Sequence, residues 1–312
     1  MNAYSTVRAV KRMAAGMVMA AIPVIYTQAA DTLTVTLMGD ILLDRGVRRA
    51  IERKGMEHLF SASVDSVFRH SDVVVGNLEC PATKIKGYTN KKFVFRGEPE
   101  WLAVLKRHGV THLNLANNHS VDQGREGLAD TKRNVERAGM VSIGAGSSME
   151  EAVRPVLIAD KPRKVYVVAS LRLALENHAY LPAKTSVSQT SMDSLLHGIR
   201  QLRASEPHAF IIVCLHWGVE HRLKPTFQQV KEAHDIMDAG ADCIVGHHSH
   251  TLQSIEDYRG KKIYYSIGNF IFDQQKTINT QACMVRIKVA ETSAALETIP
   301  VEIVKCVPHV RR

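Results

Sequence analysis

The stretch Ala241-Asp242-Cys243-Ile244-Val245-Gly246-His247-His248-Ser249-His250 joins a short apolar run to three closely spaced histidines. The apolar run is typical of a buried strand, and the glycine behind it lets the backbone turn so that the imidazoles converge on one point. Neutral imidazole is a ligand that suits zinc, manganese and iron. The stretch therefore predicts a metal site at the end of a strand. The alternative interpretation is a polar loop with a chance group of histidines.

Short apolar runs of the same kind recur along the chain, and stretches with helical spacing of apolar residues separate several of them. Nearly continuous apolar runs are expected of strands buried on both faces, so the pattern indicates a layered α/β protein with a largely buried sheet. Two later runs alternate more regularly and are expected to form an antiparallel edge or a second sheet. The predicted strands cover residues 33–38, 73–75, 112–115, 165–169, 210–215, 243–245 and 263–265, the predicted helices 100–108, 124–138, 192–204 and 226–239, and the alternating runs 283–289 and 296–304.

Side chains of the types that bind metals follow five of the predicted strands. Ligands of open α/β sheets collect beyond the carboxyl ends of the strands, so these loops are expected to surround one crevice. Each residue alone has an ordinary explanation, as a cap or a satisfied core histidine, whereas the whole set points to a site. The segments are Gly39-Asp40, Gly76-Asn77-Leu78-Glu79, Ala116-Asn117-Asn118-His119, His216-Trp217-Gly218 and the histidine cluster.

The composition is that of a globular protein with a sizeable core, since 45% of the 312 residues are hydrophobic and 23% are charged. The five cysteines are scattered through apolar runs and are expected to be core residues rather than a disulfide framework. The formal net charge is +9. The first thirty residues contain three basic residues and no acidic residue, so the rest of the chain has a formal net charge of about +6. Its surface is therefore expected to be modestly basic.

The first thirty residues differ from the rest of the chain. Three basic residues precede an apolar stretch over 13–26, and a small-x-small pattern ends at Ala29. This order predicts a secretory signal peptide or an uncleaved N-terminal membrane anchor over residues 1–29, followed by one domain over 30–312. The protein is therefore expected to be exported and to act at the extracytoplasmic face of the cytoplasmic membrane or as a secreted protein.

Several motifs, taken in their order along the chain, resemble the CapA (also called PgsA) family of poly-gamma-glutamate capsule biosynthesis proteins, within the calcineurin-like metallophosphatase superfamily. The resemblance runs from about Leu33 to Asp273. It implies a four-layer αββα metallophosphatase-like sandwich, in which loops at one end of two packed sheets bind one or two metal ions. The motifs are Gly39-Asp40-Ile41-Leu42-Leu43, Gly76-Asn77-Leu78-Glu79, Phe95-Arg96-Gly97, Asn114-Leu115-Ala116-Asn117-Asn118-His119, His216-Trp217-Gly218-Val219-Glu220, the histidine cluster and Tyr265-Ser266-Ile267-Gly268-Asn269-Phe270.

The resemblance also implies a role for individual residues. Asp40, after the first strand, falls on a metal ligand, and Glu79 falls on the acid that bridges two ions, where Asp is usual. The Asn-His pair falls on Asn118, as a ligand, and on His119, as the catalytic group that stabilises or protonates the leaving oxygen. The histidines that complete the implied ligand set are His216, His248 and His250.

This sequence departs from the superfamily pattern at Leu42, where phosphatases of the superfamily usually have a histidine. A metal at that position would lose a ligand unless Asp44 or His247 supplies one. Glu220 is a further candidate, as a partner that orients a ligand histidine. The resemblance therefore implies one or two divalent ions, Mn, Zn or Fe, and leaves both two-metal occupancy and phosphatase activity open.

The segment that follows Glu79 is strongly basic and carries Lys84, Lys86, Lys91, Lys92 and Arg96. A loop here is expected to lie over the crevice, where Lys91, Lys92 and Arg96 would bind an anionic substrate. Arg96 is the best candidate for pairing with a carboxylate through two nitrogens. The alternative is a solvated lysine-rich hairpin.

Together, these features predict a protein of capsule or poly-gamma-glutamate biosynthesis that hydrolyses a phosphoester or the amide bond of the polymer with the help of a metal. The alternative is a non-catalytic subunit that binds the anionic polymer as it leaves a membrane poly-gamma-glutamate synthase complex. No nucleic-acid-binding module is recognisable, so nucleic acid is not expected as a partner.

Overall fold

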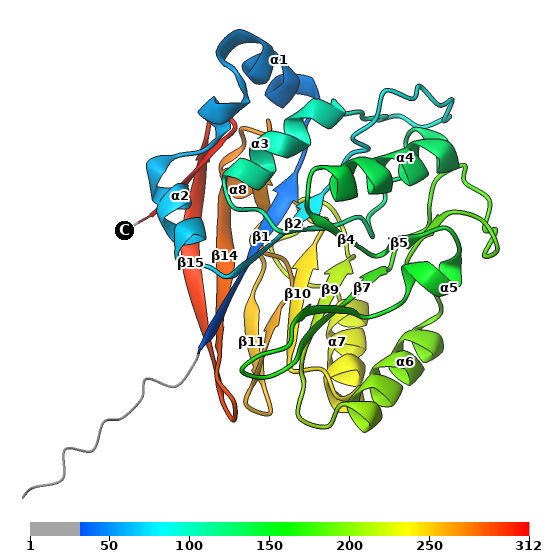
Figure 1. Cartoon of the computed structure of the whole chain (residues 1–312), viewed down its shortest axis with the longest axis vertical. Coiled ribbons are helices and arrows are strands. Elements are labelled where there is room, and N and C mark those ends of the chain that lie inside the picture. Colours follow the sequence, from blue (N-terminus) through cyan, green and yellow to red (C-terminus); the bar gives the residue numbers. More distant parts are fainter. Residues whose placement is uncertain (1–31, 312) are drawn as a thin grey trace, which may run out of the picture. The chain divides into compact units, whose positions relative to one another are not determined.

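Two β-sheets that pack face to face form the centre of the structure, a computed structural model that describes residues 32–311 (Figure 1). In the first sheet β1, β2, β3 and β4 are parallel, and β14, β15 and β16 add an antiparallel edge. Its strands in spatial order are β16 (Val307–Val310), β15 (Ala294–Val304), β14 (Gln281–Val289), β1 (Leu33–Ile41), β2 (Val73–Leu78), β3 (His112–Asn114) and β4 (Val141–Ile143), with β13 (Asn269–Ile271) also paired to β1.

The second sheet has four parallel strands at its centre and one antiparallel strand at each edge. A separate two-stranded sheet consists of β5 (Ala145–Gly146) and β8 (Ser186–Val187). In spatial order, the six strands of the second sheet are β11 (Ile255–Tyr258), β12 (Lys261–Tyr264), β10 (Cys243–His247), β9 (Phe210–His216), β7 (Val165–Leu171) and β6 (Val156–Ala159).

Helices cover the outer face of each sheet, as Figure 1 shows. Helices α1 to α4 share an apolar core with the first sheet, and α6 and α7 share another with the second, while a third core fills the space between the sheets. The predicted four-layer αββα sandwich is thereby confirmed. The helices are α1 (Arg45–Lys54), η1 (Met56–Leu59), α2 (Ala62–Arg69), η2 (Pro99–Trp101), α3 (Leu102–Arg107), α4 (Gly124–Arg137), α5 (Met149–Ala152), α6 (Met192–Ser205), α7 (Phe227–Ala239) and α8 (Thr277–Thr280).

Strand β9 shows why the site strands have continuous apolar sequences. Ile212 and Cys214 point into the core between the two sheets, whereas Ile211 and Val213 point into the core beneath α6 and α7. Successive side chains of a strand face opposite sides, so a strand with an apolar layer on each side needs apolar residues at every position. The strand becomes polar only at its carboxyl end, where His216 leaves both cores.

The two late alternating runs form the antiparallel edge, and not the second sheet. Strands β14 and β15 extend the first sheet beyond β1. The second sheet is built from the runs at 165–169, 210–215, 243–245 and 263–265. A strand buried on both faces has the same pattern in either sheet, so the sequence did not separate the two sets.

Helix α1 was not among the predicted helices. Its buried residues are Val47, Ala50 and Ile51, and most of its other positions are charged, so its apolar stripe is narrow. Asp44 is the N-cap and accepts a hydrogen bond from the backbone of Arg45. This cap was the sequence signal for a helix start, because Asp is a favoured N-cap residue.

The remaining predictions concern the chain as a whole. The described residues belong to one compact unit, and none of their helices is both long and apolar enough to span a membrane. The predicted signal peptide or anchor over residues 1–29 lies outside the described residues. All five cysteines are free, as predicted, and only Cys306 is partly exposed.

Candidate metal centre

The carboxyl ends of strands from both sheets meet at one place in the structure. Asp40 lies in β1 and Asn77 in β2 of the first sheet, while His216 ends β9 and His247 ends β10 of the second. Asn77 Nδ2 donates to Asp40 Oδ1 at 2.8 Å, and His247 Nδ1 lies 3.1 Å from the same oxygen. The five predicted loops therefore do converge, and they converge at the junction of the two sheets.

Two groups of three side chains at this junction have ligand atoms close enough to share an ion. One group is Glu79, His216 and His248, and the other is Asp40, Glu79 and His250. Within each group the ligand atoms all lie within 4.8 Å of one another. Glu79 belongs to both groups, so its carboxylate lies between two candidate ion positions.

Glu79 is fully buried, and neither carboxylate oxygen has a hydrogen-bond partner among residues 32–311. The rings of His216 and His250 lie beside it, with Nε2 atoms 3.6 and 3.7 Å from Oε1. Burial, followed by repulsion from Asp40, raises the pKa of Glu79 well above its usual range. A buried carboxylate without partners is costly, so its retention indicates that it binds a ligand.

Asp40 is also fully buried, but it is well paired. Burial alone would raise its pKa, yet hydrogen bonds from His247 and His250 outweigh burial and hold the pKa well below its usual range. Oδ2 lies 3.3 Å from His250 Nδ1 and accepts from the backbone N–H of His248 at 3.4 Å. The histidine loop therefore favours the charged form of Asp40.

The backbone of the histidine loop differs from the sequence-based expectation. Strand β10 continues through Gly246 to His247, so the chain does not turn at the glycine. A Cβ at Gly246 would lie 2.0 Å from the backbone oxygen of Tyr265, so a glycine is needed here to let the segment around Tyr265 approach closely. The turn is made by His248 and His250, with φ of 89° and 55°. Left-handed backbone at non-glycine residues is strained and concentrates at functional sites.

The three imidazoles of the two groups differ in charge. Burial, with the neighbouring His250, lowers the pKa of His248 to about 4, and burial with His248 lowers the pKa of His216 well below its usual range. Burial would also lower the pKa of His250, but Glu79 and Asp40 raise it to about 9. His248 Nδ1 is buried without a hydrogen-bond partner in the described part of the chain. His216 and His248 are therefore neutral at pH 7, which is the form that binds metals.

Asn118 faces the same point from the loop after β3. Its Oδ1 lies 2.8 Å from His216 Nε2, and so both atoms can approach one ion. Beneath them Asn77 Oδ1 accepts from the amides of Asn114 and Asn117 at 3.2 and 3.3 Å. This buried ladder of amides fixes the ends of β2 and β3. The motifs contained these asparagines, but their mutual contacts were not predicted.

His119 has a buried partner that the sequence analysis missed. Its Nδ1 lies 2.8 Å from Oδ2 of Asp122, and its ring packs 4.3 Å from the ring of Phe95. Burial lowers the pKa of His119, although Asp122 opposes the shift. No hydrogen bond to His119 Nε2 occurs among residues 32–311, so Asp122 orients the ring and leaves that nitrogen available. The i,i+3 spacing of the two residues was the only sequence signal.

The three candidate substrate-binding residues do not form an exposed basic loop. The side chain of Lys91 is 3% exposed and its ammonium pairs with Asp122 Oδ1 at 2.7 Å. The guanidinium of Arg96 donates to the Thr83 carbonyl at 2.9 Å and pairs with Glu98 at 3.2 Å. Only Lys92 is exposed, with its ammonium 5.2 Å from the ring of Phe93. Lys91 therefore supports the His119 pair from within, because the loop folds inward onto Asp122.

The other predicted residues occupy distinct places. Asp44 caps α1, and its Oδ2 accepts from the backbone of Arg96 at 2.8 Å, so both oxygens are engaged away from the two groups of ligands. His247 binds Asp40, as described above. Glu220 is exposed, with Oε2 3.8 Å from His221 Nε2, and its charge acts on Glu79 and His248 from the rim. Leu42 is fully buried in the core beneath the first helix layer.

The described side chains suit a divalent metal. Two acidic groups, three imidazoles and an amide oxygen converge, and Glu79 and His248 have buried atoms without partners. Mixed nitrogen and oxygen donors of this kind bind zinc, manganese and iron. The roles of the individual residues as ligands stay predictions, and the geometry fits them.

Comparisons with known proteins identify the family of the chain. A family model described as "Bacterial capsule synthesis protein PGA_cap" matches residues 34–274. The "PGA biosynthesis protein CapA" of Bacillus subtilis is 33% identical over 92% of this chain and 76% of its own length. The "Capsule biosynthesis protein CapA" of Bacillus anthracis is 32% identical over 88% of this chain and 68% of its own length.

Among solved structures, a Thermus thermophilus "Sulfate thiohydrolase SoxB in complex with glycerol" is similar with a TM-score of 0.48 and 12% identity. The match covers 86% of this chain and 56% of that protein.

Proposed function

This chain belongs to the PGA_cap family of bacterial capsule synthesis proteins, and from that premise we propose that it is an exported metal-dependent hydrolase of poly-gamma-glutamate biosynthesis. It would hydrolyse a phosphoester bond or the amide bond of the polymer. The Bacillus subtilis relative named for PGA biosynthesis supports the substrate class, and the order of charges and apolar residues over residues 1–29 supports export. The site of action would be the extracytoplasmic face of the membrane, next to membrane synthase subunits.

One observation carries the catalytic part of the proposal. Glu79 is shared by two groups of ligand atoms and has no partner for either oxygen. Glu79 would hold a divalent cation together with either group of ligand atoms, and such a cation would satisfy its buried oxygens. Two divalent ions, when bound, would acidify a water and polarise the oxygens of the scissile group.

The chain's own residues would supply orientation and proton transfer. Asp40 is held charged by His247, so it can bind a cation without first losing a proton. Asp122 fixes His119 through Nδ1 and favours the protonated ring, which would donate its Nε2 proton to the leaving oxygen and become neutral. Phe95 covers one face of the His119 ring and limits water at that side.

The second candidate function is a non-catalytic subunit that binds the anionic polymer. It is favoured by Leu42, a buried aliphatic residue where the superfamily pattern has a ligand. In that case the site would bind a single structural ion or bind it weakly, and the family role would rest on polymer binding alone.

The experiment that tests the proposal is elemental analysis of the purified protein after reconstitution with manganese or zinc, compared with His248→Ala. In parallel, hydrolysis of a chromogenic phosphodiester and shortening of poly-gamma-glutamate are followed. About two bound ions, lost in part with His248, together with turnover of either substrate would support the hydrolase. An exposed histidine substitution, His197→Ala, serves as the matched control.

The negative outcomes separate the two functions. No bound ion after reconstitution overturns the hydrolase and leaves the binding subunit. Two bound ions without turnover of either substrate contradict the proposed substrates while preserving the metal centre.

A further inference from the structure

A basic pocket of about 340 Å³ opens between α1 and the turn that joins β15 to β16. Residues of α1 form one side, and the turn residues Lys305 and Cys306 form the other. The basic residues that line it are Arg49, Arg53, Lys54, His58 and Lys305. All five are exposed, so their charged groups are accessible to a ligand from solvent.

The positive charge of the pocket is not neutralised by the protein. Within residues 32–311, Arg49, Arg53, Lys54 and Lys305 form no ion pair with a carboxylate. The pocket has one acidic lining residue, Asp273, and its carboxylate already pairs with Arg45 and accepts from the backbone of Gly46 at 2.9 Å. A concave surface with unpaired cations and no free acid attracts anions.

The turn that carries Lys305 has a costly backbone. Val304 pairs with Val307, which leaves Lys305 and Cys306 as the two central residues, with φ of 50° and 74°. Two-residue hairpin turns with positive φ at both central positions favour Asn-Gly, so Lys-Cys is an unfavourable choice for folding alone. The choice places a cation at the pocket instead.

The pocket also adjoins the metal centre. Arg45 pairs with Asp273 of the pocket, and its guanidinium carbon lies 5.3 Å from the ring of Phe95 and 5.5 Å from that of Phe272. These rings pack against the imidazoles of His119 and His250 at 4.3 and 4.7 Å. Two side chains, Arg45 and then Phe95 or Phe272, therefore connect Asp273 of the pocket to His119 and His250 of the metal centre.

We infer that this pocket is an anchoring site for successive carboxylates of an acidic polymer chain, which it holds beside the metal centre. The inference rests on the proposed function for the nature of the polymer. Arg49 and Arg53 are one helical turn apart, with Cβ atoms about 5–6 Å from each other, so they can bind neighbouring carboxylates of one chain. Guanidinium groups pair with carboxylates through two parallel hydrogen bonds. The pocket would thus bind the anionic substrate, the role that was predicted for Lys91, Lys92 and Arg96.

The first test measures binding of fluorescently labelled poly-gamma-glutamate to the full chain by anisotropy. Arg49→Glu/Arg53→Glu is compared with Arg69→Glu/Arg200→Glu, which makes the same charge change at exposed arginines of α2 and α6 outside the pocket. The pocket variant is expected to weaken binding at least about tenfold, since each arginine contributes charge-assisted hydrogen bonds. The control variant is expected to remain within about twofold of the parent.

A second test locates the ligand without mutating the pocket. Cys306 lines the pocket and is the one cysteine of the chain that is not buried. Poly-gamma-glutamate is expected to slow maleimide labelling of Cys306 at least about threefold at saturation, because a bound chain covers the thiol. Labelling of a Cys306→Ser variant reports any contribution from the buried thiols.

Each outcome decides between interpretations. Equal losses in both variants would mean that bulk charge attracts the polymer, and the pocket assignment would be wrong. If the protein bound inorganic polyphosphate tightly and did not bind polyglutamate, the proposal that the pocket binds carboxylates would be wrong. If the pocket variant binds metal and polymer as the parent does, this inference alone is refuted. If the parent protein binds no metal after reconstitution, the proposed hydrolase is refuted, and the binding test of the pocket still applies.

Discussion

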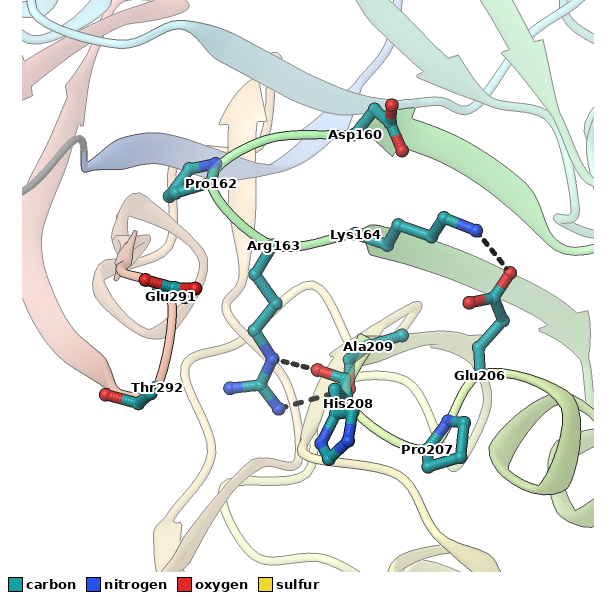
Figure 2. Close-up of a pocket in the computed structure, with 10 residues that line it drawn as sticks. All are labelled: Asp160, Pro162, Arg163, Lys164, Glu206, Pro207, His208, Ala209, Glu291 and Thr292. Carbon is teal, nitrogen blue, oxygen red and sulfur yellow. Dashed lines mark hydrogen bonds and ion pairs between the residues drawn. The ribbon is translucent and has the colours of Figure 1, made fainter.

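Both ends of the parallel strands carry charged side chains, but the partners of these side chains differ. An acidic residue is paired with a lysine at the amino ends, and a buried acidic residue lacks a hydrogen-bond partner at the carboxyl ends. At the amino ends a pocket of about 580 Å³ is lined by residues that precede β7 and β9 and by the tip of the β14–β15 hairpin (Figure 2). There Lys164 pairs with Glu206 at 2.6 Å, and Arg163 donates to the carbonyls of His208 and Ala209. At the carboxyl ends Glu79 is fully buried, and neither of its oxygens has a hydrogen-bond partner in the described part of the chain.

The difference shows that buried polar atoms without partners are a better guide to a binding site than the presence of a pocket. In the amino-end pocket Lys164 pairs with Glu206 and Arg163 donates to backbone carbonyls, as the dashed lines of Figure 2 show. The metal centre retains buried polar atoms of Glu79 and His248 without hydrogen-bond partners among residues 32–311, and a bound ligand would stabilise them. Four substitutions test this contrast.

The largest effect is expected for Asp122→Asn. The amide cannot hold His119 in the same tautomer, so hydrolysis by the metal-loaded protein should fall about 10²–10⁴-fold. The rate is measured with the chromogenic phosphodiester at saturating metal. Metal content should not change, and Lys91→Met, which removes only the ammonium that pairs with Asp122, should reduce the rate less. An unchanged rate in Asp122→Asn would exclude His119 as the acid.

Next in size is Glu79→Gln in the metal-free protein. An uncompensated buried charge destabilises a fold by about 3 kcal/mol, and the amide removes that charge. Because burial and Asp40 raise the pKa of Glu79 in the folded state, the folded protein loses stability as the pH rises above the usual carboxyl range. Urea unfolding should therefore show a stabilisation by Glu79→Gln that is larger at pH 8 than at pH 5. If Glu79→Gln were less stable than the parent at pH 8, the interpretation that the buried charge of Glu79 destabilises the metal-free protein would be wrong.

A smaller effect is expected at His112, a buried residue of β3 outside the ligand groups. Burial, with Lys106, lowers its pKa to about 4, so the unfolded chain takes up a proton near pH 6.5 before the folded chain does. Stability is therefore lost as the pH falls through this window, by about 2 kcal/mol between pH 7 and pH 5. His112→Gln should reduce this loss in urea unfolding. His208→Gln in the amino-end pocket is the matched control and should leave it unchanged.

The smallest effect is expected for Glu206→Gln, which breaks the Lys164 pair of the amino-end pocket. Both side chains are partly exposed, and pairs of this kind contribute little because water solvates each partner. The melting temperature should stay within about 1 °C of the parent. A shift as large as that of Glu79→Gln would remove the contrast between the two ends.

The sequence predicted the fold class well and its internal division poorly. The strands at 210–215 and 243–245 and the helix at 226–239 occur within a few residues of their predicted bounds. Helix α1 was missed because charged residues outnumber its three buried ones. The sheet to which each strand belongs was also not predicted, since strands buried on both faces have the same sequence pattern in either sheet.

For the site, the sequence was enough to indicate which residues can bind a metal, because ligand chemistry is a property of residue type and strand ends place those residues at one edge. Their charges and partners became known only from the folded chain. There Glu79 is buried without a hydrogen-bond partner among residues 32–311, Asp40 is held by histidines, and Lys91 points inward to Asp122. Desolvation and partner distance depend on segments far apart in the chain, so no local pattern contains them.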